Sequence, residues 1–278
     1  MRVLAPAKLN LCLYLGPRRG DGLHELCSLF EPIALADRLE VSDDDRDEVV
    51  CEGLDGDNLA RRALELLRER GWRAPPKRIE IDKRIPVAAG LGGGSADAAA
   101  VLRLARGEVD EVEELASRLG ADVPSQVDPR FALVVGAGER IEPLGEPAEH
   151  AFVLLPAEGG LSTANVFAEA DRLGLGRSPD ELEAIAVRLR AATDAGASPL
   201  SYTELLVNDL EPAALSLRPE VGVALGALRD AGAAASLVTG SGPTAFGLFA
   251  DRGGADEAVR ALRAEWPAAV ASVPGPRP

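Results

Sequence analysis

KRIPVAAGLGGGSAD, residues 83–97, has the composition in this chain that packing alone explains least. Three consecutive glycines at 92–94 are followed by Ser95 and by an alanine-rich segment with high helix propensity. This order predicts a strand, a glycine loop and a helix over 96–106, with Ser95 as its N-cap. The loop suits an anion such as phosphate, because glycines let a ligand approach the backbone and the first helical N–H groups are unpaired. A glycine turn that binds nothing fits the same residues equally well.

The composition describes an acidic protein with enough apolar residues for a large core. The 278 residues carry a formal net charge of -15, and 46% of them are hydrophobic. The negative charge argues against nucleic acid or an anionic membrane as the main partner. The chain has no signal-peptide pattern and no run of about eighteen apolar residues, so we expect a cytoplasmic protein. Its three cysteines are widely spaced and form no CxxC pair, which argues against a zinc site.

Lysine is rare in this chain and occurs only at Lys8, Lys77 and Lys83, while arginine supplies the other 27 of the 30 basic residues. The apolar alternation over 9–15 predicts a strand, in which Lys8 and Asn10 lie on the same face. A face of this kind is often only solvated, and both interpretations stay open at this point.

Two other polar residues stand beside turns. His24 follows the Gly-Asp-Gly turn at 20–22, where its ring could stack on or hydrogen-bond to a ligand, although a lone histidine is more often structural. Asp122 lies just ahead of Pro124, and the restriction that proline imposes predicts a fixed, non-helical corner for this carboxylate. A structural Asx turn is the alternative for Asp122.

A polar, proline-containing segment at 143–150 marks the expected domain boundary. It predicts an N-terminal domain over 1–148, which carries the glycine loop, and a C-terminal domain over 149–278. The C-terminal half mixes helical segments with a strand, glycine turn and strand over 234–249.

Common nucleotide and nucleophile motifs do not fit the glycine loops. No lysine follows Gly94 or Gly242, which excludes a P-loop. Pro243 and the alternating residues after it predict a strand, whereas a dinucleotide fold requires a helix there. Asp97 replaces the final glycine of a nucleophile elbow, so Ser95 is not expected to be acylated.

Three segments together carry a family resemblance: PAKLNL at 6–11, PVAAGLGGGSADAA at 86–99 and TGSGP at 239–243. They resemble the three motifs of the GHMP small-molecule kinases, which include galactokinase, homoserine kinase and mevalonate kinase. With DGLH at 21–24 and GADVP at 120–124, the chain is most similar to the family of 4-diphosphocytidyl-2-C-methyl-D-erythritol kinases. The similarity extends over about residues 3 to 250.

The resemblance implies an α+β, two-domain GHMP kinase fold, with an N-terminal ribosomal protein S5 domain 2-like domain, a C-terminal ferredoxin-like domain and the active site in the cleft between them. It implies ATP-dependent phosphorylation of the 2-hydroxyl of 4-diphosphocytidyl-2-C-methyl-D-erythritol, in the non-mevalonate isoprenoid pathway. A kinase of homoserine or mevalonate type, or a catalytically silent ligand-binding regulator, is the alternative.

The same resemblance assigns roles to residues. Asp122 matches the catalytic base and Lys8 the catalytic lysine, while Ser95 would lie near the phosphates and Mg²⁺. Asn10, His24, Gly240 and Gly242 match positions that contact the substrate. The residues expected to bind ATP are Val87, Ala88, Ala89, Gly90, Leu91, Gly92, Gly93, Gly94, Ser95, Ala96 and Asp97.

The chain departs from the family pattern at Leu23, where an aromatic residue commonly packs on the cytosine. Apolar contact would survive there but stacking would be lost, which costs about 1 kcal/mol. Phe167 is the residue expected to supply an aromatic wall instead. The segment SQVDPR at 125–130 also lacks the usual glycine-rich continuation. A monomer or homodimer is expected.

Overall fold

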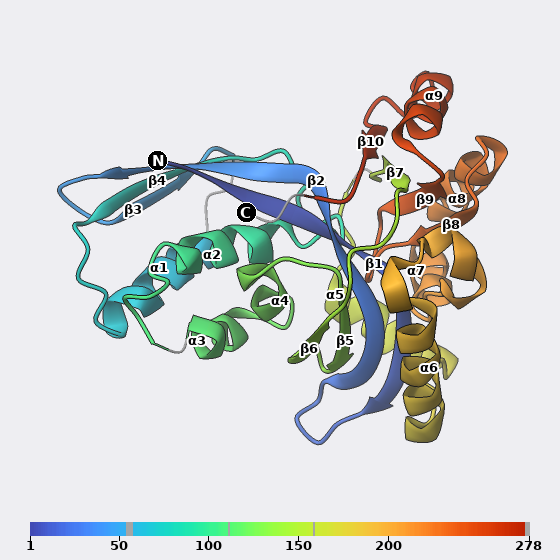
Figure 1. The fold of residues 1–278 in the computed structure, drawn as a ribbon, viewed down its shortest axis with the longest axis horizontal. Coiled ribbons are helices and arrows are strands. Elements are labelled where there is room, and N and C mark those ends of the chain that lie inside the picture. The colour runs from blue at the N-terminus through green and yellow to red at the C-terminus, as the bar shows by residue number, and fades with distance from the viewer. Residues whose placement is uncertain (54–57, 111, 158, 276–278) are drawn as a thin grey trace.

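The computed structural model describes residues 1–53, 58–110, 112–157 and 159–275, and these residues form two sheets with helices packed on them. The first sheet has the order β3-β4-β2-β5-β6, with β1 paired to β2. The long antiparallel pair of β1 and β2 runs through the middle of the molecule (Figure 1). The strands of this sheet are β1 (Arg2–Arg18), β2 (His24–Asp43), β3 (Glu48–Cys51), β4 (Lys77–Asp82), β5 (Ala132–Gly136) and β6 (Arg140–Pro143).

Four helices pack together beside one part of this sheet (Figure 1). They are α1 (Leu59–Glu69), α2 (Gly93–Arg103), α3 (Val112–Leu119) and α4 (Val123–Val127). The helix α2 is buried from Ala96 to Leu102, because its alanines let neighbouring helices approach closely. The glycine loop at its N-terminus is therefore fixed to the core of this part of the chain.

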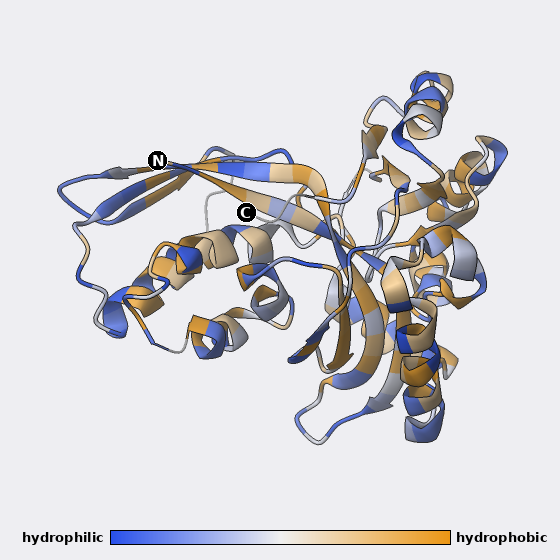
Figure 2. Cartoon of the chain, in the orientation of Figure 1, coloured by the Kyte–Doolittle hydropathy of each residue, from blue (hydrophilic) through white to orange (hydrophobic). Residues whose placement is uncertain are grey.

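The second sheet is antiparallel and has the order β10-β7-β9-β8. Its strands are β7 (Ala151–Leu155), β8 (Ala235–Val238), β9 (Ala245–Phe249) and β10 (Val270–Ser272). The helical segments that follow the boundary are α5 (Thr163–Leu173), α6 (Pro179–Ala192), η1 (Asp194–Gly196), η2 (Pro199–Leu205), α7 (Glu211–Leu217), α8 (Val221–Asp230) and α9 (Arg252–Leu262). Hydrophobic and hydrophilic residues share individual helices, as expected where one face packs inward (Figure 2).

The prediction for the start of α2 was wrong. The helix begins at Gly93, three residues before the expected position, and Ser95 lies inside its first turn and is not the N-cap. Gly92 is the N-cap, with φ 71° and ψ 17°, and its carbonyl accepts from the backbone N–H of Ala96 at 2.8 Å. Only glycine adopts this left-handed conformation readily, so the glycine run starts the helix early.

Two other expectations have outcomes in the fold. In the part of the chain that the structure describes, no helix has both the length and the apolar composition needed to cross a membrane. The three cysteines are free, with Cys12 and Cys27 buried and Cys51 half-buried.

Candidate active site

A cavity of about 1000 Å³ lies between the glycine loop, strand β1, the turn before β2 and helix α5. It brings together most of the residues that the sequence singled out. Ala96, which is fully buried, and Gly242 do not line it. The predicted residues that do line it are Lys8, Asn10, His24, Val87, Ala88, Ala89, Gly90, Leu91, Gly92, Gly93, Gly94, Ser95, Asp97, Asp122, Phe167 and Gly240.

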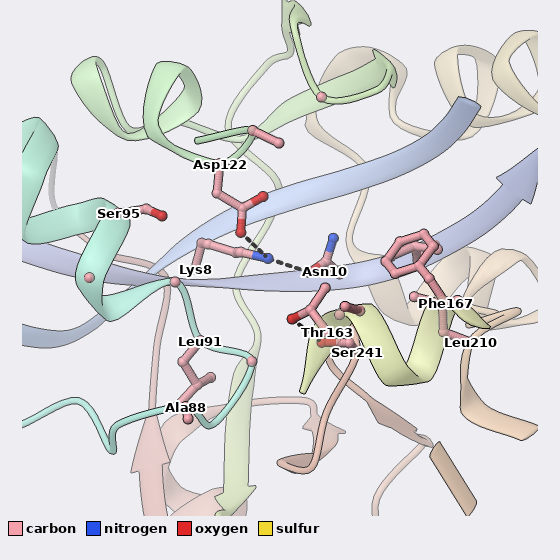
Figure 3. Close-up of a pocket in the computed structure, with 18 of the residues that line it drawn as sticks. Lys8, Asn10, Ala88, Leu91, Ser95, Asp122, Thr163, Phe167, Leu210 and Ser241 are labelled. Carbon is pink, nitrogen blue, oxygen red and sulfur yellow. Dashed lines mark hydrogen bonds and ion pairs between the residues drawn. The ribbon is translucent and has the colours of Figure 1, made fainter. Parts of the chain in front are cut away.

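Lys8 lies at the centre of this cavity, and its side chain is only 6% exposed (Figure 3). Its Nζ is 3.3 Å from Oδ2 of Asp122 and donates a hydrogen bond to Oδ1 of Asn10 at 2.5 Å. The ammonium also lies 4.6 Å from the centroid of the Phe30 ring. The backbone N–H of Lys8 donates to the carbonyl of Leu91 at 3.0 Å. These contacts hold the ammonium beside the glycine loop in one orientation.

Asp122 is in the helical region, and the predicted non-helical corner was wrong. Its φ is -85° and its ψ is -18°, and it precedes the first residue of α4. Proline acts on the residue directly before it, which is Val123, and Pro124 is tolerated in the first helical turn because no N–H is needed there. The Asp122 side chain makes no capping hydrogen bond and is 36% exposed, so its carboxylate is free to face a ligand.

The glycine segment at 239–243 packs against strand β1. Gly240 lies beside Asn10, whose backbone N–H donates to Oγ1 of Thr239 at 2.9 Å. The side-chain nitrogen of Asn208 donates to the carbonyls of Val238 and Gly240, at 2.7 and 2.8 Å. The buried Asn208 amide therefore sets the path of this loop.

The far end of the cavity is lined by rings and apolar side chains. The ring of His24 lies 5.2 Å from that of Phe167, with an interplanar angle of 35°. Leu23 also lines this end, and 53% of it is exposed. The cavity thus has the glycine loop at one end, the Lys8 ammonium near its centre, and a partly apolar surface with two rings at the other end.

Comparisons with known proteins agree with this arrangement. The models for the GHMP kinases N terminal domain and the GHMP kinases C terminal region match residues 58–130 and 189–268. The chain is 44% identical to a 4-diphosphocytidyl-2-C-methyl-D-erythritol kinase of Mycolicibacterium gilvum (strain PYR-GCK), over 91% of this chain and 83% of that protein. It is 40% identical to the protein of the same name in Streptomyces avermitilis, over 99% and 97% of the two chains.

The chain belongs to the 4-diphosphocytidyl-2-C-methyl-D-erythritol kinase family. A crystal structure of 4-(cytidine 5'-diphospho)-2C-methyl-D-erythritol kinase has a TM-score of 0.80 and 38% identity, and the match covers 99% of this chain and 100% of the other. A homoserine kinase from Cytophaga hutchinsonii, at 18% identity and a TM-score of 0.74, shares the fold. The predicted GHMP kinase fold and the predicted class of ATP-dependent small-molecule kinase are confirmed.

Sequence reasoning missed an ionic cluster beneath the glycine loop of this kinase. Nζ of Lys83 donates to both Asp37 and Asp97, the latter at 2.7 Å. Asp37 also accepts from the backbone N–H groups of Arg84 and Ile85, at 2.6 and 2.8 Å. Lysine rarity was a signal for Lys83, but nothing in the sequence pairs it with Asp37, 46 residues away.

The cluster makes the stability of the kinase depend on pH. Burial raises the pKa of Asp97 to about 7; the Lys83 ammonium opposes this rise and the neighbouring Asp37 carboxylate adds to it. The folded state therefore holds this proton more tightly than the unfolded state, and stability falls as pH rises from about 4 to about 7. We expect Asp97→Asn to remove this loss, so that its unfolding free energy relative to wild type rises by roughly 2 kcal/mol between pH 5 and pH 8. Denaturant unfolding at both pH values measures the change.

The exposed Asp82 is a matched control, because Asp82→Asn should leave the pH dependence of unfolding as it is in wild type. If the free energy of unfolding changed with pH by the same amount in wild type and in Asp97→Asn, the prediction for Asp97 would be contradicted.

Gly90 tests the contact between the glycine loop and the segment at 239–243. Its φ is 79°, and a Cβ there would lie 2.7 Å from the carbonyl oxygen of Thr239 and 2.9 Å from that of Gly242. We expect Gly90→Ala to destabilise the kinase by about 2–4 kcal/mol, because both backbone strain and a clash arise. Gly107→Ala is the control, since Gly107 has a similar φ of 84° but a Cβ added there would meet nothing within 4 Å. Equal losses in denaturant unfolding would contradict the clash.

The residues present fit a Mg²⁺ ion that is held mainly by phosphates. The described residues contain no group of three or more His, Cys, Asp or Glu side chains placed to bind a metal. Ser95 lines the cavity in the first turn of α2, and its hydroxyl makes no hydrogen bond to another described residue. Mg²⁺ in kinase sites is usually bound through one or two carboxylates together with substrate phosphates and waters. Ser95 offers one hydroxyl oxygen, so phosphates and waters would supply most of the remaining ligands.

Proposed function

We propose that this chain transfers the γ-phosphoryl group of ATP to the 2-hydroxyl of 4-diphosphocytidyl-2-C-methyl-D-erythritol. The observation that carries this proposal is the ion pair of Lys8 with Asp122, 3.3 Å long, in a cavity that also contains the glycine loop. Phosphoryl transfer needs a positioned proton acceptor and positive charge near the transferring group, and this pair supplies both.

Asp122 is the proposed base. The 2-hydroxyl gives its proton to the carboxylate while its oxygen forms a bond to the γ-phosphorus, and the bond from that phosphorus to the bridging oxygen of ADP breaks. Asp122 suits this role because its carboxylate is partly exposed and makes no helix-capping bond. Lys8 lowers the energy of the developing negative charge, and Asn10 and Phe30 hold its ammonium in place.

The glycine loop is the proposed site for the ATP phosphates. Its residues 90–94 line the cavity, and the α2 N-terminus presents unpaired N–H groups there. Ser95 would hold Mg²⁺ together with the phosphates, and the ion would neutralise part of the phosphate charge when bound. Ala96 contributes through its position inside the helix, because its side chain does not reach the cavity.

The proposed substrate site extends from Asn10 and Gly240 toward the two rings. The base of the cytidine would lie against His24 and Phe167, whose rings line this end of the cavity. Phe167 thus supplies an aromatic surface that Leu23 does not. Gly240 leaves room beside Asn10 and Lys8, since a Cβ there would lie 3.1 Å from Oδ1 of Asn10.

We further propose two domains, 1–148 and 149–278, in a monomer or homodimer. The division is supported by the two sheets, because strands β1 to β6 form one and β7 to β10 the other.

An ADP-release assay with Mg²⁺ and ATP tests the function. The chain is offered 4-diphosphocytidyl-2-C-methyl-D-erythritol, 2-C-methyl-D-erythritol, homoserine and mevalonate in separate reactions. We expect turnover with the first substrate alone, and phosphorus NMR should place the new phosphate on the 2-hydroxyl. Turnover of only an alcohol without cytidine would contradict the proposal.

A further inference from the structure

Asp171 holds one nitrogen of the His24 ring. Its Oδ1 lies 2.8 Å from Nε2 of His24. A carboxylate only accepts hydrogen bonds, so Nε2 must carry the proton of this contact. Neutral imidazole has a single N–H, which leaves Nδ1 as an acceptor. Nδ1 makes no hydrogen bond to any residue that the structure describes, and His24 lines the cavity.

Helix α5 brings Asp171 and Phe167 to the same place. The two residues are four positions apart, so they share one face of the helix. Phe167 packs near the His24 ring, and both Phe167 and Asp171 line the cavity. One helix therefore provides both a surface for stacking and the carboxylate that orients the neighbouring imidazole.

We infer that Asp171 makes the cavity prefer cytosine to uracil, by keeping Nδ1 of His24 as an acceptor; this inference rests on the proposed function. Cytosine carries an amino group at its 4-position, which donates a hydrogen bond. Uracil carries a carbonyl oxygen there, which would meet the lone pair of Nδ1. Asp171 acts through His24 and is thus a positioning residue.

Three substitutions of Asp171 separate this role from a structural one. Kinetics at pH 8 compare the cytidine substrate with its uridine analogue, and we expect wild type to prefer cytidine by about 10–100-fold in kcat/KM. Asp171→Ala should lower this preference to less than about threefold, mainly through KM for the cytidine substrate. Asp171→Glu should restore most of it. Asp171→Lys, whose ammonium donates to Nε2, should favour the uridine analogue, because Nδ1 then carries the proton.

The matched control is Asp230→Asn, which changes an exposed aspartate at the end of α8, away from the cavity. It should leave the cytidine preference unchanged.

Nitrogen NMR gives a readout that needs no turnover. His24 and His150 are the only histidines of the chain, so their ring nitrogens can be assigned directly. We expect the Nε2–H form for His24 in wild type and a mixture of the two tautomers in Asp171→Ala. The Nδ1–H form in wild type, or an unchanged cytidine preference in a folded Asp171→Ala protein, would overturn the inference.

Calorimetry with cytidine diphosphate and uridine diphosphate separates the inference from the proposed function. If wild type turns over neither substrate, the proposed function fails. The inference still stands if wild type binds cytidine diphosphate more tightly than uridine diphosphate and Asp171→Ala binds both alike. The inference is wrong if Asp171→Ala still binds cytidine diphosphate more tightly than uridine diphosphate by the wild-type factor.

Discussion

Asp122→Asn is expected to lower kcat by about 10³-fold, because asparagine keeps the shape of the side chain but cannot take the proton of the acceptor hydroxyl. KM for ATP should change by less than about threefold, since the proposed phosphate site lies on the glycine loop. Steady-state ADP release measures both constants. Calorimetric titration with a non-hydrolysable ATP analogue checks that the nucleotide site stays intact.

Asp128→Asn is the matched control for this change. Asp128 lies at the other end of α4 and pairs with Arg130. Its substitution should leave kcat within about twofold of wild type. Near-normal turnover of Asp122→Asn would remove Asp122 from the chemistry and would require another base in the cavity.

Lys8→Met is expected to lower kcat by about 10²–10³-fold, because the ammonium proposed to face the transferring phosphoryl group is lost while the length of the side chain is kept. Lys8→Arg should not restore the rate. The aliphatic part of Lys8 packs against Gly92, where an added Cβ would lie 3.1 Å from Cγ of Lys8, and a planar guanidinium needs more room. Turnover with the cytidine substrate at saturating ATP measures the effect.

Lys77→Met is the control, because Lys77 pairs with Asp43 on the sheet surface and does not line the cavity. It should retain wild-type kcat. Full activity of Lys8→Arg would show that any positive charge suffices, which would contradict the geometric argument for lysine.

Local patterns in the sequence determined much of the secondary structure. Helix α1 begins at Leu59 directly after its N-cap Asn58, because the apolar spacing and the cap act between near neighbours. Helix α6 likewise begins with a local signal, the capping box in which Ser178 and Glu181 each accept a hydrogen bond from the other's backbone N–H. The glycine loop and two of the three rare lysines, Lys8 and Lys83, line the cavity, whereas Lys77 does not.

The start of α2 and the conformation of Asp122 could not be predicted in the same way. Gly92 takes a left-handed backbone that begins the helix before Ser95. Pro124 restricts the residue directly before it, Val123, so it does not fix the backbone of Asp122. Glycine permits two backbone paths at position 92 and no proline restriction acts at position 122, so the packing of the surrounding chain selects the conformation in both places.

The sequence by itself was enough to identify the glycine segments, Lys8 and the order of the family motifs, because each is defined by residue types at short spacings. Only the tertiary structure showed which residues far apart in the sequence form hydrogen-bonded pairs. Asp171 meets His24 from 147 residues away, and Asn208 reaches Gly240 across 32. Such contacts depend on how helices and sheets pack, and no local periodicity encodes that packing. The end of the cavity proposed for the substrate therefore depends on tertiary packing, whereas the end proposed for the phosphates is already visible in KRIPVAAGLGGGSAD.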